Sequence, residues 1–448
     1  TSLSTRVLPT YLVQSVAICK IRYAAAARRS FWTPLDAAIM ARSRSASKRF
    51  PTLPPITGMR LGGISAHIRH HGRKDLMLVV FDRPTPVAGV FTRSTAASAA
   101  VRWDRSILSG ARARALVVNS GNANAWTGGA GSETVEQIVQ AVAAIVSCPI
   151  RHVFVSSTGV IGEVLDSSKI KNVLPRLHRQ LTPKNWTAAA RAIMTTDTFP
   201  KGATRSATIN GRAVTINGIA KGSGMIAPNM ATMLAYVFTD ARLPARLLQR
   251  MLRAANRGSF NAITVDGDTS TSDTVLAFAT GAVALGFNPT SLRDPRLAEF
   301  RAALGSLTVD LAQQIVRDGE GASKFVTISV KGAASSCSAR GIAFSIANSP
   351  LVKTAIAGSD PNWGRIIMAI GKTSQAINSE KLSVRIGPYL TTEGGGVKAE
   401  YDESRVAEYM KGDEIDIDVH VGVGRGRATV WTCDLTHQYV TINADYRS

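Results

Sequence analysis

A turn-rich segment followed by an uninterrupted apolar run lies near the middle of this chain. The segment Lys221–Leu234 contains two glycines, which allow turn conformations closed to other residues, and a proline, which stiffens the backbone after them. The run Met233–Phe238 comes next and is typical of a buried strand. The pattern therefore predicts a core strand with a rigid segment at its entrance.

Thr232 stands at the mouth of this predicted strand. A threonine hydroxyl in such a place can act as a nucleophile if a base removes its proton. The threonine's own α-amine can be that base, because its pKa is near neutrality once the chain has been cut before the residue. The alternative is an ordinary β-branched residue that opens a strand. Spacing alone leaves both interpretations open.

Other segments predict the elements around this strand. Two alternating runs, Ala207–Ile209 and Ala213–Ile216, flank Asn210-Gly211 and predict a β-hairpin with a type I′ turn. Leu76–Phe81 and Val87–Phe91 predict two further strands.

Helical spacing and alternation complete this picture. Apolar residues at helical spacing predict a helix that Ser132 caps and Pro149 ends. The final third alternates apolar and polar residues, as in Ile415–Val421, and is β-rich. With abundant glycine, these elements favour an α/β fold.

Composition excludes several classes of protein. The 448 residues are enough for two or three domain-sized units, and no apolar run reaches membrane-spanning length, so no membrane partner is expected. The cysteines show no C-x-x-C pair, and the histidines show no helical ligand spacing, so no metal site is expected. Gly422–Gly426 lies between predicted strands and does not match a dinucleotide loop, so no cofactor is expected either.

The positive charge is concentrated at the N-terminus. The chain carries a net charge of +22, and residues 1–50 hold nine Lys or Arg and one acid, Asp36. This arginine-rich, serine-rich and acid-poor composition predicts a mitochondrial transit peptide over 1–50. A disordered basic tail is the alternative. Because so much of the charge lies there, a nucleic-acid partner is not expected from the rest of the chain.

The segment Lys221–Leu234 closely resembles the self-cleavage site of the ornithine acetyltransferases, also called glutamate N-acetyltransferases or the ArgJ family. The similarity runs from about Gly58 to Ser448 and rests on irregular motifs that occur in the family's order. These motifs are Asn119–Gly128, Ser157–Gly162, Thr195–Thr198, Lys221–Leu234, Thr264–Thr271, Glu320–Lys324, Asp360–Arg365 and Asn443–Ser448.

The resemblance implies a fold and a processing event. The fold would be an αββα sandwich like that of the β-aminopeptidases, of the N-terminal-nucleophile type, with a smaller C-terminal α/β portion. Cleavage between Ala231 and Thr232 would give an α chain, 51–231, and a β chain, 232–448. Two copies of each would form a heterotetramer.

The resemblance also implies the site residues. Thr232 would be the acyl-accepting nucleophile, and Thr158 and Gly159 would form the oxyanion hole. The substrate-binding positions would be Thr195 or Thr196, Lys221, Thr232, Glu320, Asn443 and Ser448. The charges fit these roles, because Lys221 suits an α-carboxylate and Glu320 suits an ammonium group.

The activity implied is ping-pong acetyl transfer from N2-acetylornithine to glutamate in arginine biosynthesis, in the mitochondrial matrix. Acetyl-CoA would be a further acetyl donor and therefore a co-substrate. Two alternatives belong to other classes: an aminopeptidase of the related fold, and a basic nucleic-acid-binding or scaffold protein. The Lys221 and Glu320 matches argue against the aminopeptidase.

Overall fold

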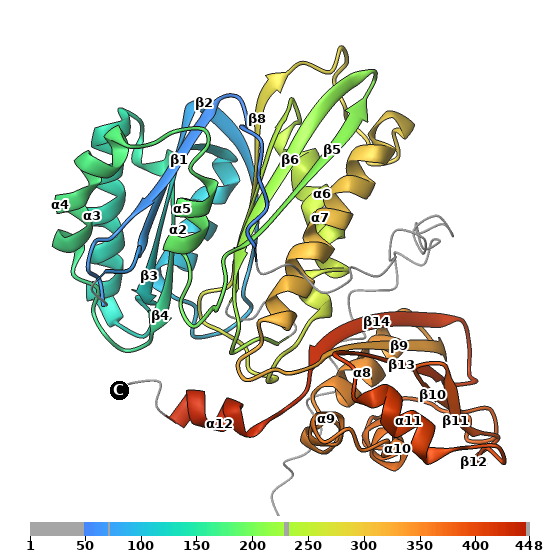
Figure 1. Ribbon diagram of the computed structural model, residues 1–448. Coiled ribbons are helices and arrows are strands. Elements are labelled where there is room, and N and C mark those ends of the chain that lie inside the picture. The colour runs from blue at the N-terminus through green and yellow to red at the C-terminus, as the bar shows by residue number, and fades with distance from the viewer. Residues whose placement is uncertain (1–48, 70–71, 228–232, 445–448) are drawn as a thin grey trace, which may run out of the picture. The chain divides into compact units, whose positions relative to one another are not determined.

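The computed structural model describes residues 49–69, 72–227 and 233–444 (Figure 1). Almost all of the predicted transit peptide lies outside the described residues, as do Ala231, Thr232 and Ser448. Among the helices that are described, none has both the length and the apolar character needed to cross a membrane.

The first half of the described chain builds a sheet of eight strands. Its order is β4-β3-β2-β8-β7-β6-β5, and β1 pairs with β2 beside this path. The strands are β1 (Met59–Ile64), β2 (Leu76–Phe91), β3 (Arg112–Asn122), β4 (Val153–Val160), β5 (Lys201–Ile209), β6 (Arg212–Lys221), β7 (Leu234–Ala241) and β8 (Thr274–Val283).

Strand β2 joins the two halves of this sheet. Its first part pairs with β1 and β3, and its last part pairs with β8. The register with β3 shifts between Val80 and Thr85, and the stretch between them contains Pro84, a residue that strands accept at irregularities. The prediction of two separate strands over 76–81 and 87–91 was therefore wrong, because one bent strand runs through both.

The two halves of the sheet pack against each other through a buried aromatic cluster. Phe81 of β2 lies 4.9 Å from Phe278 of β8, measured between ring centroids, and Phe154 of β4 meets Phe278 edge-on at 6.4 Å. Phe238 of β7 stacks on Phe278 at 5.4 Å. All four side chains are fully buried, so each half of the sheet forms one inner layer.

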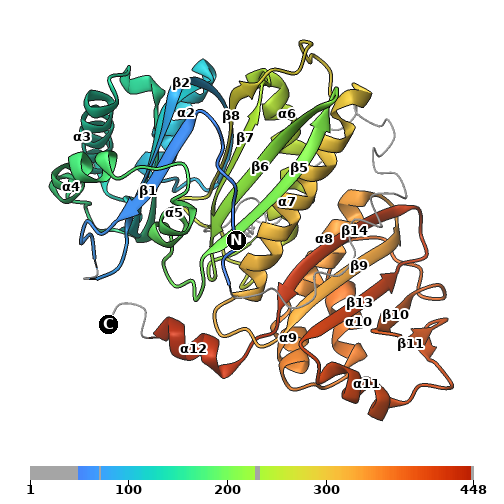
Figure 2. The ribbon, with the colours of Figure 1, turned by 45° about the horizontal axis from the view of Figure 1, so that its top comes forward.

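Helices cover the outer face of each layer, as Figures 1 and 2 show. The first layer packs on α2 (Ala99–Ile107), α3 (Gly128–Val146) and α4 (Ser167–Arg179), and the second layer packs on α6 (Ala245–Arg257) and α7 (Ala298–Arg317). A short helix, α5 (Trp186–Ala192), adds to the cluster between the layers. The predicted αββα sandwich is confirmed.

Two local predictions had different outcomes. The hairpin is confirmed, because β5 and β6 pair directly across Asn210 and Gly211, whose φ angles are 49° and 74°. Helix α3, however, begins at Gly128, before the predicted cap at Ser132. Glycines are poor helix formers, so the apolar pattern indicated a later start, and packing against the first layer overrides that propensity.

The last third forms a second sheet, whose order is β12-β11-β10-β13-β9-β14. Its strands are β9 (Phe325–Ala333), β10 (Ser383–Ile386), β11 (Tyr389–Glu393), β12 (Gly396–Val397), β13 (Glu414–His420) and β14 (Gly426–Cys433). Its helices are α8 (Ser336–Ala347), α9 (Pro350–Ala357), α10 (Trp363–Gly371) and α11 (Glu403–Met410). This is the predicted smaller C-terminal portion, with a hydrophobic core of its own.

The chain then returns to the first sheet. The N–H of Thr264 donates to the carbonyl of Trp431 on β14 at 3.0 Å, so β14 borders the loop before β8. The final described helix, α12 (His437–Ala444), lies against Gly321, where a Cβ would come within 2.4 Å of the Tyr439 nitrogen. Glycine at 321 therefore lets α12 approach the segment that follows α7. Short 3₁₀ turns among the described residues are η1 (Leu108–Gly110), η2 (Ile150–His152), η3 (Phe260–Ala262) and η4 (Pro295–Leu297).

Candidate active site

The parallel strands β3 and β4 end side by side with two glycines. Gly121 of β3 pairs with Gly159 of β4, which has a φ of +132°. A Cβ at Gly159 would lie 2.3 Å from the carbonyl carbon of Gly121, so no larger residue fits without backbone movement. The neighbouring Thr158 is fully buried. The predicted pair Thr158–Gly159 therefore occupies a tightly packed strand end.

Lys221 reaches this strand end from the other layer. Lys221 is the last residue of β6, it is only 2% exposed, and its Nζ donates to Thr158 Oγ1 at 3.3 Å. In the ladder it pairs with Leu234, the first residue of β7. Burial lowers the pKa of Lys221 and the nearby Lys201 lowers it further, while Asp197 opposes the shift. Two predicted site residues from separate layers are thus in direct contact.

A buried ion network fixes the segment before β5. Lys201 lies between Asp197 Oδ1 at 2.6 Å and Asp318 Oδ2 at 2.5 Å, and all three side chains are at most 2% exposed. Asp197 also accepts hydrogen bonds from the N–H groups of Gly222 and Thr195. Burial acts to raise the pKa of Asp197, but Lys201, Lys221 and Gly222 together hold it well below its usual range.

Thr195 and Thr196 lie beside this ion network and are held by further hydrogen bonds. The Thr196 hydroxyl lies 2.6 Å from that of Ser223, and the Thr195 carbonyl accepts a hydrogen bond from Arg73. The backbone carbonyl of Ser223 accepts a hydrogen bond from the N–H of Glu320 at 3.0 Å. The predicted substrate positions 195, 196 and 320 are therefore linked through one serine.

The Glu320 carboxylate lies over a glycine. A Cβ at Gly224 would come within 2.2 Å of Glu320 Oε2, and the same oxygen accepts a hydrogen bond from Asn443 Nδ2 at 2.9 Å. Because Asn443 belongs to α12, this contact brings the end of the described chain to the residues that precede β7. Glu320 and Asn443, predicted from distant motifs, meet directly.

Two aspartates hold the described residues on either side of 228–232. Asp266 accepts the N–H groups of Met225 and Ile226 at 2.5 and 2.8 Å, and Asp273 Oδ1 accepts the N–H of Met233 at 3.0 Å. Burial raises the pKa of Asp266, and it raises that of Asp273 well above its ordinary value. The loop before β8 thus anchors both flanks of the predicted cleavage segment.

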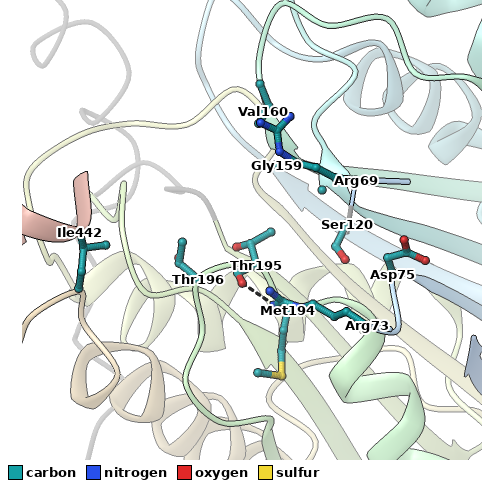
Figure 3. A pocket seen from close by; sticks show the side chains of 11 residues that line it. Arg69, Arg73, Asp75, Ser120, Gly159, Val160, Met194, Thr195, Thr196 and Ile442 are labelled. Carbon is teal, nitrogen blue, oxygen red and sulfur yellow. Dashed lines mark hydrogen bonds between the residues drawn. The ribbon is translucent and has the colours of Figure 1, made fainter. Parts of the chain in front are cut away.

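A cavity of about 250 Å³ opens beside these residues (Figure 3). Ligand pockets have roughly this size or more, so a small amino acid is a suitable occupant. Its lining is Arg69, Arg73, Asp75, Ser120, Gly121, Gly159, Val160, Met194, Thr195, Thr196 and Ile442. Gly159, Thr195 and Thr196 are the predicted site residues among them.

Sequence reasoning missed several residues that build this site. Lys201 and Asp318 were not predicted, because they pair with each other although they lie 117 residues apart in the sequence. Arg73 and Arg69 were also missed, since basic residues near a histidine-rich turn are typical of exposed surface. The aspartate in the hydroxyl-rich run 194–198 was the one available signal for the network.

Known proteins were compared with the chain. The model described as the ArgJ family matches residues 60–448. The arginine biosynthesis bifunctional protein ArgJ of Gluconobacter oxydans is 52% identical over 404 residues, which are 90% of this chain and 95% of that protein.

Two solved structures were also matched. The crystal structure of arginine biosynthesis bifunctional protein ArgJ from Bacillus halodurans is 42% identical and covers 47% of this chain and 97% of its own, with a TM-score of 0.45. The ornithine acetyltransferase of Mycobacterium tuberculosis, solved in complex with ornithine, is 33% identical and covers 40% of this chain and 94% of its own, with a TM-score of 0.34.

Proposed function

The chain belongs to the ArgJ family of acyltransferases, and on this basis we propose that it transfers an acetyl group from N2-acetylornithine to glutamate. The products are ornithine and N-acetylglutamate. Two hydrogen bonds beside one cavity of amino-acid size are the observation that carries the proposal. One joins Lys221 to Thr158, and the other joins Asn443 to Glu320. Lys221 and Glu320, each in contact with a neighbour of a lining residue, carry opposite charges that suit the two ends of an amino-acid substrate.

The nucleophile is proposed to arise by self-cleavage. The Thr232 hydroxyl attacks the Ala231 carbonyl carbon, and the acyl group moves from the Thr232 nitrogen to its oxygen. Water then hydrolyses the ester, which leaves a carboxylate on Ala231 and a free α-amine on Thr232. The hydrogen bonds that hold Met225, Ile226 and Met233 support this step, because they fix the described chain on both sides of the bond that is attacked.

Transfer then proceeds in two halves. The Thr232 α-amine takes the hydroxyl proton while the oxygen attacks the acetyl carbon of N2-acetylornithine. The proton passes to the leaving amine, ornithine departs, and an acetyl ester remains on Thr232. The amine of glutamate attacks that ester, its proton returns through the α-amine to the threonine oxygen, and N-acetylglutamate leaves.

Thr158 and Gly159 are proposed to stabilise the negative oxygen that forms in each half. Because Thr158 Oγ1 accepts a hydrogen bond from Lys221, its own hydrogen is free to be donated to that oxygen. A preorganised donor of this kind lowers a barrier by about 3 kcal/mol. Lys221 also suits the substrate α-carboxylate, and Glu320 with Asn443 suits its ammonium group. Ser448 and one of Thr195 and Thr196 complete the proposed substrate contacts.

The remaining assignments are also part of the proposal. Residues 1–50 direct the protein to the mitochondrial matrix, the chains 51–231 and 232–448 form a heterotetramer of two copies each, and acetyl-CoA acetylates glutamate as a second donor. Three measurements test these assignments in turn. The first is mitochondrial import of a fluorescent protein fused to residues 1–50, the second is the native mass of the purified protein, and the third is glutamate acetylation with acetyl-CoA alone.

The central experiment compares wild type with Thr232→Ala by intact mass and by acetyl exchange. We expect two fragments divided between Ala231 and Thr232 in wild type, one uncut chain in the variant, and exchange only in wild type. An uncut but active wild-type chain would refute the self-cleavage. A cut chain that hydrolyses peptide amides but does not release ornithine from N2-acetylornithine would favour the aminopeptidase.

A further inference from the structure

Two arginines that the proposed reaction leaves unused line the cavity at one side. Arg69 and Arg73 lie on the loop between β1 and β2, and Figure 3 shows both side chains bordering the cavity with Thr195. We refer to Arg69 and Arg73 as the basic end of the cavity. Arginine side chains at a substrate cavity favour binding of an anionic group of the substrate.

The described residues just before Arg69 are held in place by Asp75. Asp75, only 5% exposed, accepts the N–H of Ala66 at 2.6 Å and the N–H of Ile68 at 2.7 Å. Its carbonyl accepts the N–H of Ser120 at 2.9 Å, which ties the loop to the end of β3. Both oxygens of Asp75 are thus engaged by backbone groups, and the carboxylate fixes residues 66–68, which lead to Arg69.

Each arginine is oriented by one further contact. Arg69 Nη1 pairs with Glu163 Oε2 at 3.0 Å, and the Arg69 Cβ lies 3.1 Å from where a Cβ of Gly121 would stand. Arg73 Nη2 donates to the carbonyl of Thr195. A guanidinium has five N–H donors, so these contacts hold each group in place and leave donors for a ligand.

The opposite side of the cavity leads toward an acidic residue, Glu320, which lies outside the lining itself. Thr196 and Ile442 line it there, and they lead to Glu320 through the Thr196–Ser223 contact and through Asn443, the neighbour of Ile442. The basic end therefore faces the side of the cavity that leads to Glu320. The two amino acids of the proposed exchange also differ in charge, because ornithine has a cationic side chain and glutamate has an anionic one.

We propose that Arg69 and Arg73 form the subsite that binds the side-chain carboxylate of the acceptor glutamate, and that they set the enzyme's preference for an anionic acceptor. This inference rests on the proposed function. A planar guanidinium matches a carboxylate through paired N–H donors, and it repels the side-chain ammonium of ornithine. The basic end thereby distinguishes the acceptor half of the reaction from the donor half.

The test measures each half of the reaction in Arg69→Gln and Arg73→Gln. We expect kcat/KM for glutamate to fall about 10- to 100-fold through KM, as for the loss of one charge-assisted hydrogen bond. With glutamine, the uncharged analogue of glutamate, kcat/KM should stay unchanged, and so should the release of one equivalent of ornithine from N2-acetylornithine without acceptor. Arg73→Gln also loses a contact to Thr195, so Arg69→Gln provides the independent variant.

Two matched variants complete the design. Lys74→Gln removes the same charge from the same loop at an exposed residue outside the cavity lining, and glutamate KM should not change. Glu163→Gln frees Arg69 from its ion pair, so glutamate KM should fall, about twofold, as expected for an exposed pair.

Three outcomes would overturn the inference. The first is an unchanged preference for glutamate over glutamine in both arginine variants. The second is an equal loss in the ornithine-release step, which would indicate a merely structural role. The third is a higher KM for acetyl-CoA with normal glutamate selectivity, which would assign the basic end to phosphate groups. A wild type that releases no ornithine would instead refute the proposed function itself.

Discussion

The variant Lys201→Met removes the cation that two buried carboxylates share. Lys201 Nζ lies 2.6 Å from Asp197 and 2.5 Å from Asp318, and the three side chains are at most 2% exposed. Removing one partner of a buried ion pair costs about 3–5 kcal/mol, because the remaining charge stays desolvated and unpaired. With two carboxylates left, we expect the free energy of unfolding at pH 7 to fall by about 4–5 kcal/mol.

The pH dependence of this loss has a definite sign. In wild type the pKa of Asp197 is below its unfolded value, so its contribution to stability is present above about pH 4 and is lost as the pH falls through the folded pKa. Asp318 behaves differently, because burial and the neighbouring Asp197 raise its pKa in spite of Lys201. Without Lys201, burial is less opposed at both carboxyls, so we expect both folded pKa values to rise. Protonation then removes the unpaired charge, so the loss should shrink from pH 7 to pH 5.

The assay is denaturant unfolding at pH 5, 6 and 7, followed by circular dichroism, in a Thr232→Ala background so that chain cleavage does not differ between samples. Arg205→Met is the matched control, because Arg205 lies on the same strand and pairs with Asp310 at 2.9 Å with both side chains about one-third exposed. It should cost at most about 1 kcal/mol. A loss below about 1 kcal/mol for Lys201→Met at pH 7, or one that grows on acidification, would refute the reasoning.

Three further predictions concern the proposed site. Gly159→Ala should lower stability and acetyl exchange together, because the new Cβ would lie 2.3 Å from backbone at a φ of +132°; Gly162→Ala, also at positive φ but with open space around the Cβ, should be milder in the same thermal melts and exchange assays. Thr158→Val should lower kcat about 10²- to 10³-fold and also lower the melting temperature, because buried Lys221 loses its acceptor, whereas Thr158→Ser should retain most activity and stability; equal rates for Val and wild type would exclude an oxyanion role. Glu320→Gln should raise KM for N2-acetylornithine more than kcat falls, and an unchanged donor KM in initial-rate measurements would contradict its contact with the donor.

Local pattern was sufficient for several elements of the fold. The hairpin around Asn210-Gly211 was predictable because a two-residue turn with positive φ angles needs those residue types. The first part of β7, residues 234–238, was predictable because it is buried on both faces and is therefore an unbroken apolar run, whereas the strand continues past this run to Ala241. The family resemblance added residues that no pattern identifies, and the structure brings Thr158 to Lys221 and Glu320 to Asn443.

Long-range contacts decided what the pattern could not. Strand β2 continues past the prolines because its two ends find different partners, β3 and β8, and only the assembled sheet supplies them. Lys201 is buried because carboxylates 4 and 117 residues away surround it; by itself a lysine predicts an exposed position.

The basic end of the cavity shows the same division. The sequence determined that Arg69 and Arg73 are cationic and flank a turn, and that charge alone is compatible with any solvated loop. The fold determined that Asp75 holds residues 66–68, which lead to Arg69, at the end of β3 and beside Gly159. Residue type fixes the charge of a side chain, whereas its environment and partners come from chain segments that only the tertiary structure brings together.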